Sequence, residues 1–215
     1  DEDALKAMCE QTRVIISTVG PYALYGEPLV QACVRSGTDY CDLTGEVQWI
    51  AKMVQRYEEE AKASGARIVH CCGFDSIPSD MGVWFLQNQA EQTFGEPCRD
   101  VRMRVKTAKG EFSGGTVASL MNAVKEASAD PKLRKQMANP FSICPPEHRS
   151  KTRQPSLKGA EFDKTFNAWL APFVMAAINT RVVHRSNAMQ NARYGKEFTY
   201  DEAMMTGRGT KGRLA

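Results

Sequence analysis

The sequence has no apolar run long enough to cross a membrane. Its longest run extends from Trp169 to Ile178, whereas a membrane-spanning helix needs about 20 apolar residues. The first residues, DEDALKAMCEQ, are not basic and do not lead into the apolar core of a signal peptide. We therefore expect a cytoplasmic protein without a transmembrane segment, and we leave open whether it contacts a membrane peripherally.

The sequence also has little excess charge of either sign. It contains 28 Lys and Arg against 25 Asp and Glu, which gives a net charge of +3. A nucleic-acid binder would show a clustered basic excess, so we expect no nucleic-acid partner.

The cysteines form no C-x-x-C pair. There are 7 of them, an odd number, and most lie in apolar runs, which predicts free thiols in a reducing compartment. His70, Cys71 and Cys72 are adjacent in a predicted strand, where alternate side chains point to opposite faces and cannot easily converge on an ion. We expect no metal site.

What the sequence does have is a regular alternation of short apolar runs and helical patterns. The apolar runs predict strands at 13–18, 39–43 and 67–72, and the patterns around them predict helices at 3–10, 28–35, 46–64 and 81–89. Strands that alternate with helices are typical of parallel βαβ units in an α/β fold.

The second half of the chain has a mixed character. Period-two alternation predicts a strand at 98–108, and 166–189 is interpreted as mostly helical. Four prolines predict a long loop at 140–159, and EFTYDEAM is either a short strand or a helix start. We place a boundary near residue 92, which separates domains 1–92 and 93–215.

Polar clusters follow the three predicted strands of the first half. They are TVGPY, DLTGE and GFDSIPSD. In a parallel sheet, ligands bind outside the carboxyl ends of the strands. We therefore expect the three loops 18–22, 42–46 and 73–80 to lie side by side as one wall of a binding cleft.

The stretch TVGPYALYGEPLVQACVRSGTDYCDLTGE, followed by HCCGFDSIPSDMG, resembles the saccharopine dehydrogenase-like oxidoreductases, a family that includes trans-acting enoyl reductases. The likeness continues through FSGGT and YGKEFTYDEAM. It implies a partial, doubly wound parallel Rossmann domain at 1–92 and a second α/β segment at 93–215 for substrate and dimer contacts. It also implies that the chain is a fragment lacking the Gly-rich phosphate loop, which in this family would precede residue 1.

The resemblance further implies a cofactor and its contacts. NADP is expected in preference to NAD, with the first loop passing close to the nicotinamide ribose; that loop consists of Thr18, Val19, Gly20, Pro21 and Tyr22. Glycine permits close approach of a ligand, and proline fixes the turn. From the residues alone, an ordinary strand-to-helix turn is the favoured interpretation of the same loop.

The second and third loops supply the expected substrate-side residues, which are Asp42, Thr44, Gly45, Asp75 and Ser76. Catalytic residues are not assigned, but Glu46, Asp75 and Ser76 are candidates, because a carboxylate in a dry cleft can act as an acid or base.

Each candidate also has a structural alternative. Thr44 or Glu46 could instead serve the start of the helix that follows, and Asp75 and Ser76 could cap the next one, with Pro78 in its first turn. FSGGT could bind an anion through backbone N–H groups or be a simple turn.

The implied function is NADP-dependent reduction of a double bond by hydride transfer. The bond would be C=C in an enoyl, lipid or polyketide substrate, or C=N in an imine, and the enzyme would be a homodimer acting on a small or lipid-like molecule. The alternative is a non-catalytic binding or scaffold protein that retains the Rossmann frame, because fold alone does not fix function.

Overall fold

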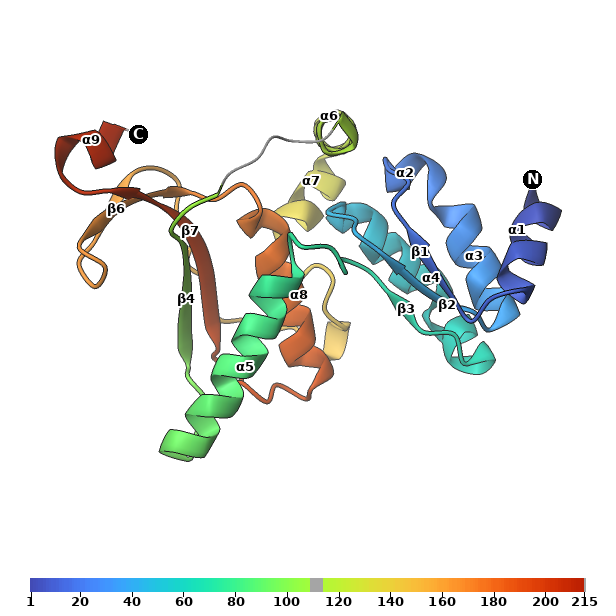
Figure 1. The fold of residues 1–215 in the computed structure, drawn as a ribbon, viewed down its shortest axis with the longest axis horizontal. Coiled ribbons are helices and arrows are strands. Elements are labelled where there is room, and N and C mark those ends of the chain that lie inside the picture. The colour runs from blue at the N-terminus through green and yellow to red at the C-terminus, as the bar shows by residue number, and fades with distance from the viewer. Residues whose placement is uncertain (109–113, 215) are drawn as a thin grey trace. The chain divides into compact units, whose positions relative to one another are not determined.

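The structure is a computed structural model that describes residues 1–108 and 114–214 (Figure 1). It divides into two compact units. The first comprises residues 1–77 and 112–143, and the second comprises 78–111 and 144–215. Because these units interleave along the chain, they do not coincide with a single boundary, and the functional division near residue 92 stays a prediction.

The first unit is built on a parallel sheet of three strands in the order β1, β2, β3. The strands are β1 (Val14–Ser17), β2 (Asp39–Asp42) and β3 (Ile68–Val69), and both pairings are parallel. The prediction of three parallel strands in one sheet is thus confirmed. However, β3 is shorter than the predicted 67–72, because the chain turns out of the sheet at Cys71, whose φ is +62°.

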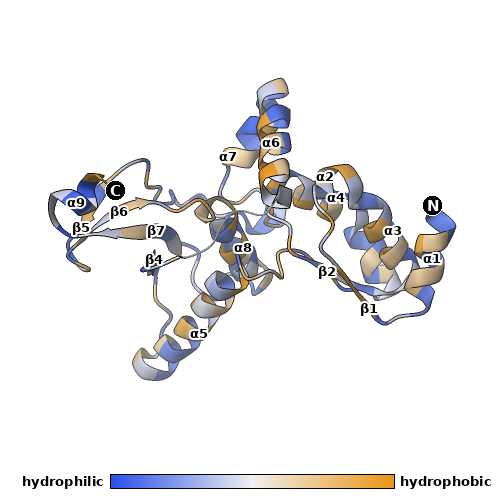
Figure 2. Cartoon of the chain, turned by 45° about the horizontal axis from the view of Figure 1, so that its top comes forward, coloured by the Kyte–Doolittle hydropathy of each residue, from blue (hydrophilic) through white to orange (hydrophobic). Residues whose placement is uncertain are grey.

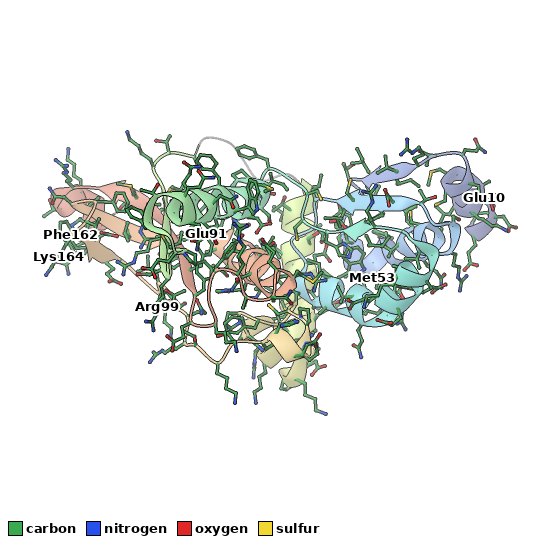
Figure 3. The ribbon with its side chains drawn as sticks, turned by 90° about the horizontal axis from the view of Figure 1, so that it is seen from below. Glu10, Met53, Glu91, Arg99, Phe162 and Lys164 are labelled. Atoms are coloured by element: carbon green, nitrogen blue, oxygen red, sulfur yellow. The ribbon has the colours of Figure 1, made fainter. Side chains whose placement is uncertain are left out.

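Helices connect these strands as expected for βαβ units. They are α1 (Glu2–Glu10), α2 (Tyr22–Tyr25), α3 (Glu27–Ser36) and α4 (Val47–Ser64). Gly37 and Gly65 end α3 and α4 in the left-handed conformation. The buried side of α4 includes Ile50, Tyr57 and Met53, which is labelled in Figure 3.

The two faces of this sheet differ in burial. Tyr40 and Asp42 lie on one face and are almost fully buried, whereas Ile16 and Val69 on the other are 72% and 50% exposed. Figure 2 shows the apolar character of β1. Parallel sheets are normally covered on both faces, so the described residues of this unit cover one face only.

The first unit also contains α6 (Gly114–Ala129) and α7 (Pro131–Ala138). The pattern after FSGGT predicts a helix, and α6 is that helix, whereas α7 was not predicted. Residues Phe112 and Ser113 of FSGGT lie outside the described residues.

The second unit contains a four-stranded mixed sheet in the order β4, β7, β6, β5. Its strands are β4 (Asp100–Val105), β5 (Glu161–Asp163), β6 (Ala168–Pro172) and β7 (Thr199–Gly207). Strands β4 and β7 are parallel, and the other pairs are antiparallel. The helices are α5 (Ile77–Phe94), α8 (Ala176–Met189) and α9 (Gly209–Leu214), with a short 3₁₀ helix η1 (Pro146–His148).

The core of the second unit joins α5 and α8 to the sheet through Val83, Val183 and Tyr200. An ion pair between Glu91, labelled in Figure 3, and Arg193 links α5 to the segment after α8. Among the described helices, none is both long and apolar enough to span a membrane.

The strands of this sheet test two predictions for the second half of the chain. The interpretation of 166–189 as mostly helical was wrong at its start, because Ala168–Pro172 form β6 and α8 begins only at Ala176. Ala168 and Leu170 are buried while Trp169 between them is not, which is the period of a strand. EFTYDEAM contributes to β7, so the strand alternative was the correct one.

Candidate functional site

The loops after β1, β2 and β3 meet at the carboxyl edge of the first unit's sheet. Two buried carboxylates, Asp42 and Glu46, make most of the hydrogen bonds that join them, and their side chains turn inward. The exposed surface of the edge is thus formed by other residues of the same loops.

Glu46 connects the first loop to the second and to α6. It occupies the N-cap position of α4 but makes no side-chain cap bond there. Instead, its carboxylate accepts hydrogen bonds from Tyr22 N at 2.7 Å, Ala23 N at 2.9 Å and Ser119 Oγ at 2.8 Å. Glu46 is 3% exposed, so its negative charge is compensated by these donors at the start of α2.

Asp42 connects the second loop to the third. Its Oδ1 accepts from Thr44 N at 3.1 Å and Cys71 N at 3.0 Å, and its Oδ2 lies 2.7 Å from His70 Nδ1. The Asp42 side chain is completely buried. A carboxylate that holds one nitrogen of a histidine fixes the orientation of the ring.

Aromatic rings enclose this Asp42–His70 pair. The His70 ring stands edge-on to Trp49, with centroids 4.9 Å apart, and to Tyr40 at 5.9 Å. Burial raises the pKa of Tyr22 to about 12 and raises the pKa of Tyr40 as well, so neither phenol exchanges a proton readily near neutral pH. The Tyr22 hydroxyl donates to Ser17 O at 3.0 Å.

Further contacts place residues 71–73 beside the second loop. Cys71 Sγ lies 3.1 Å from Thr44 O, and Cys72 N donates to Asp42 O at 2.6 Å. Gly73 is so close to Leu43 that a Cβ added to it would lie 2.8 Å from the Leu43 Cβ. Glycine at position 73 therefore allows the two loops to touch.

The residues predicted to contact the cofactor are split between surface and interior. Thr18 and Val19 are exposed, Gly20 and Pro21 are half-buried, and Tyr22 is buried. Gly20 does not adopt a positive φ, so its backbone conformation does not require glycine. The exposed part of this loop is uncharged, which suits an uncharged nicotinamide ribose, and its residues fit that end of NADP.

The substrate-side candidates also differ in burial. Thr44 is buried, and its Oγ1 accepts from Glu46 N at 3.1 Å, so its hydroxyl does serve the start of α4. Asp75 is exposed, whereas Ser76 is 3% exposed. Helix α5 begins directly after Ser76 and has Pro78 in its first turn. Gly45 is exposed beside Glu46.

Two members of the site escaped the sequence interpretation. His70 was considered only as a metal ligand and rejected. The parallel register that pairs Cys41 with Val69 places Asp42 beside His70, and this register could have revealed the pair. Ser119 lies far away in the chain and carries no local signal. All seven cysteines are free thiols, as predicted.

A hollow in the first unit lies at the opposite edge of the sheet. Its lining includes Arg13, Asp39 and Arg67 at the amino ends of the strands. Arg67 and Asp39 neutralise each other in an ion pair. Because ligands of parallel sheets bind at the carboxyl ends, this hollow does not compete with the three loops as a cofactor site.

Comparisons with known proteins find similar sequences. Residues 1–69 match the family model of the saccharopine dehydrogenase NADP binding domain. A protein of Mycobacterium tuberculosis described as a trans-acting enoyl reductase is 42% identical over 209 residues, which are 94% of this chain and 50% of that protein.

Trans-acting enoyl reductases of Mycobacterium leprae and Mycobacterium bovis are each 38% identical, over 95% of this chain and 50% of their own length. This chain thus spans about half the length of the curated relatives it matches. No solved structure matches it significantly. The resemblance found in the loop motifs is confirmed: the chain is similar to trans-acting enoyl reductases over almost its whole length and matches the saccharopine dehydrogenase NADP binding domain over its first 69 residues.

Proposed function

We propose that this chain is part of an NADP-dependent oxidoreductase that reduces the C=C bond of an enoyl group on a lipid- or polyketide-type substrate. The observation that carries the proposal is the set of three loops joined at the carboxyl edge of a parallel sheet. The first two of these loops lie within residues 1–69, the region that matches an NADP binding domain. That edge is where such sheets bind nucleotide cofactors.

NADPH, when bound, supplies the hydride, and the residues of this chain position and enclose it. In the proposal, the uncharged backbone of Thr18, Val19 and Gly20 forms the wall beside the nicotinamide ribose. The buried Asp42 and Glu46 hold that wall in place. Domain 93–215 provides substrate contacts and a homodimer interface.

Asp75 is the exposed carboxylate among the catalytic candidates, and we propose that it contacts the substrate. Its replacement by asparagine keeps the size of the side chain and removes the charge. Asp75→Asn is expected to leave the melting temperature unchanged and to lower turnover by about tenfold or more, the lower range of effects for a group that moves or orients a proton. Unchanged turnover would remove Asp75 from the site.

The proposed function is tested first by binding and then by turnover. NADPH should raise the melting temperature of the full-length protein, of which this chain is proposed to be part, more than NADH does, because a ligand that binds the folded state stabilises it. With an α,β-unsaturated acyl thioester present, NADPH absorbance at 340 nm should fall, and a deuteride carried on C4 of the nicotinamide should appear in the product.

The other outcomes separate the alternatives. Turnover with a cyclic imine but not with an enoyl thioester would place the reaction at C=N. Failure of both NADPH and NADH to stabilise the protein would favour a scaffold that retains the fold without the reaction.

A further inference from the structure

We propose that Glu46 is a positioning residue, which holds the Thr18–Tyr22 loop in the conformation that binds the nicotinamide half of NADPH. It does so by joining the start of α2 to α6 through hydrogen bonds. This inference rests on the proposed function, because that function places NADPH against the loop. Glu46 was a candidate acid or base from the sequence, and the structure assigns it a different task.

The hydrogen bonds of Glu46 use both of its oxygens. Oε1 accepts from Tyr22 N and from Ser119 Oγ, and Oε2 accepts from Ala23 N. The carboxylate thereby joins three segments that are distant in the chain: the first loop, the start of α4 and the middle of α6. The side chain is 3% exposed and bonded through both oxygens, so it is held inside the protein and does not form part of the exposed surface of the loops.

The loop is held on two sides by this arrangement. Tyr22 is the last residue of the loop, and Tyr22 and Ala23 are the first two residues of α2. Their N–H groups therefore lie where the loop ends. On the other side, a Cβ added to Gly20 would lie 3.5 Å from Ser119 Oγ. Ser119 therefore contacts the carboxylate and lies close to Gly20 in the loop, so a change in Glu46 would also affect Ser119 beside the loop.

Conversion of the carboxylate to an amide would break this clamp selectively. Glutamine has the same shape, but its NH₂ group donates and cannot accept from a backbone N–H. In either orientation of the amide, Tyr22 N or Ala23 N would lose its partner. The N–H group left without a partner can find another acceptor only if the loop moves. A shift of a fraction of an ångström is enough to weaken a preorganised site.

The experiment uses the full-length protein of which this chain is proposed to be part, and compares Glu46→Gln, Ser119→Ala and a matched control with the unchanged protein. The control is Glu126→Gln, because Glu126 also lies on α6 and accepts a bond from Gln48 Nε2 at 2.9 Å but does not contact the loop in the structure. Binding of NADPH is followed by nicotinamide fluorescence, and binding of adenosine 2′,5′-bisphosphate, which lacks the nicotinamide half, by calorimetry. Circular dichroism melting reports folding.

Glu46→Gln should weaken NADPH binding by about tenfold, the usual consequence of one buried donor left without a partner. Its affinity for adenosine 2′,5′-bisphosphate should stay within about twofold, and Ser119→Ala should show the same selectivity with a smaller loss of about threefold. Glu126→Gln should bind both ligands as the unchanged protein does.

Three results would overturn the inference. They are unchanged NADPH affinity in folded Glu46→Gln, an equal loss of both ligands in that variant, or the same loss in Glu126→Gln. If Glu46→Gln fails to fold, Ser119→Ala decides alone, and its equality with the unchanged protein would refute the clamp. Failure of the unchanged protein to bind NADPH is a different result, which would refute the proposed function itself.

Discussion

Both units of the molecule bury carboxylates, but they use them differently. In the first unit, Asp42 and Glu46 accept most of their hydrogen bonds from backbone N–H groups of loops. In the second unit, Glu202 is equally buried, at 3% exposure. Its partners are side chains, namely the Tyr200 hydroxyl at 2.7 Å and Asn179 Nδ2 at 3.0 Å.

The difference shows what each buried charge determines. A carboxylate bonded to backbone N–H groups fixes the path of a loop, and in the first unit those loops form the ligand edge of a parallel sheet. A carboxylate bonded to side chains fixes how elements pack, and Glu202 joins β7 to Asn179 on α8. Polar interiors can thus specify either a site or a core.

The largest expected effect comes from removing Asp42. Asp42→Ala leaves Thr44 N and Cys71 N without an acceptor and His70 Nδ1 without its partner. We expect the free energy of unfolding of the first unit to fall by about 4 kcal/mol, as when one member of a buried polar network is lost. Hydrogen exchange of β1–β3 peptides should accelerate, while peptides of β4 and β7 serve as the internal reference.

Asp42→Asn is the control for this change, because it keeps the shape and one acceptor oxygen. It should destabilise the first unit by about half as much. A loss below about 1 kcal/mol in Asp42→Ala would mean that the loops hold without the carboxylate, and the contrast between the two units would disappear.

The stability of the second unit should depend on pH through His184. Burial, with a smaller contribution from Arg181, lowers the pKa of His184 from 6.5 to about 4. The unfolded chain therefore binds this proton more readily than the folded one, so the stabilisation is present above pH 6.5 and is lost as the pH falls toward 4. The loss should be about 3 kcal/mol at most.

His184→Gln isolates this contribution from that of Asp80 in the same unit. Burial raises the pKa of the Asp80 carboxyl, so its titration stabilises the folded state as the pH falls and acts in the opposite direction. The free energy of unfolding is measured in urea from about pH 7 to about pH 4 for the variant and the unchanged protein. The difference between the two values should change with pH as the protonation of His184 predicts. If the difference does not change with pH, the pKa of His184 is the same in the folded and unfolded protein.

The sheet of the first unit could be predicted from the sequence because its signals are local. The β-branched run 13–18 and the cluster DYCDL are short apolar segments between helices, and Gly37 and Gly65 end those helices where glycine is favoured. Parallel topology then gathers the following loops at one edge. These steps need no knowledge of distant contacts.

The roles of individual acids could not be predicted, because they depend on contacts across the fold. Glu46 looked like a helix-start residue or a reactive acid, but its partners include Ser119, which is 73 positions away. β6 was missed because its period-two burial precedes Pro172 in a stretch whose apolar content also fits a helix. Burial of one side chain against another decides such cases, and sequence periodicity alone does not show it.

Two glycines of the first unit should respond differently to a methyl group. A Cβ on Gly26 would lie 2.6 Å from Trp49 Cζ2 and 2.9 Å from Tyr22 O, whereas one on Gly20 would meet its neighbours at 3.5 Å. Gly26→Ala should destabilise the first unit by about 2 kcal/mol through overpacking. Gly20→Ala, its control, should change stability by less than about 0.5 kcal/mol; equal melting temperatures for the two variants would contradict the packing.

The smallest effect is expected where a buried carboxylate keeps a second side-chain partner. Tyr200→Phe removes the hydroxyl that donates to Glu202 but leaves Asn179 Nδ2 in place, and the ring still fills the core. The second unit should lose about 1 kcal/mol, the net value of one hydrogen bond, in urea unfolding followed by hydrogen exchange of β7. Because Glu202 does not hold backbone N–H groups of a loop, exchange should rise evenly along β7 and α8 rather than at one loop. The comparison would fail if the free energy of unfolding fell as much as in Asp42→Ala, or if faster exchange were confined to a loop. Carboxylates bonded to side chains and to backbone N–H groups would then have the same structural role in this protein.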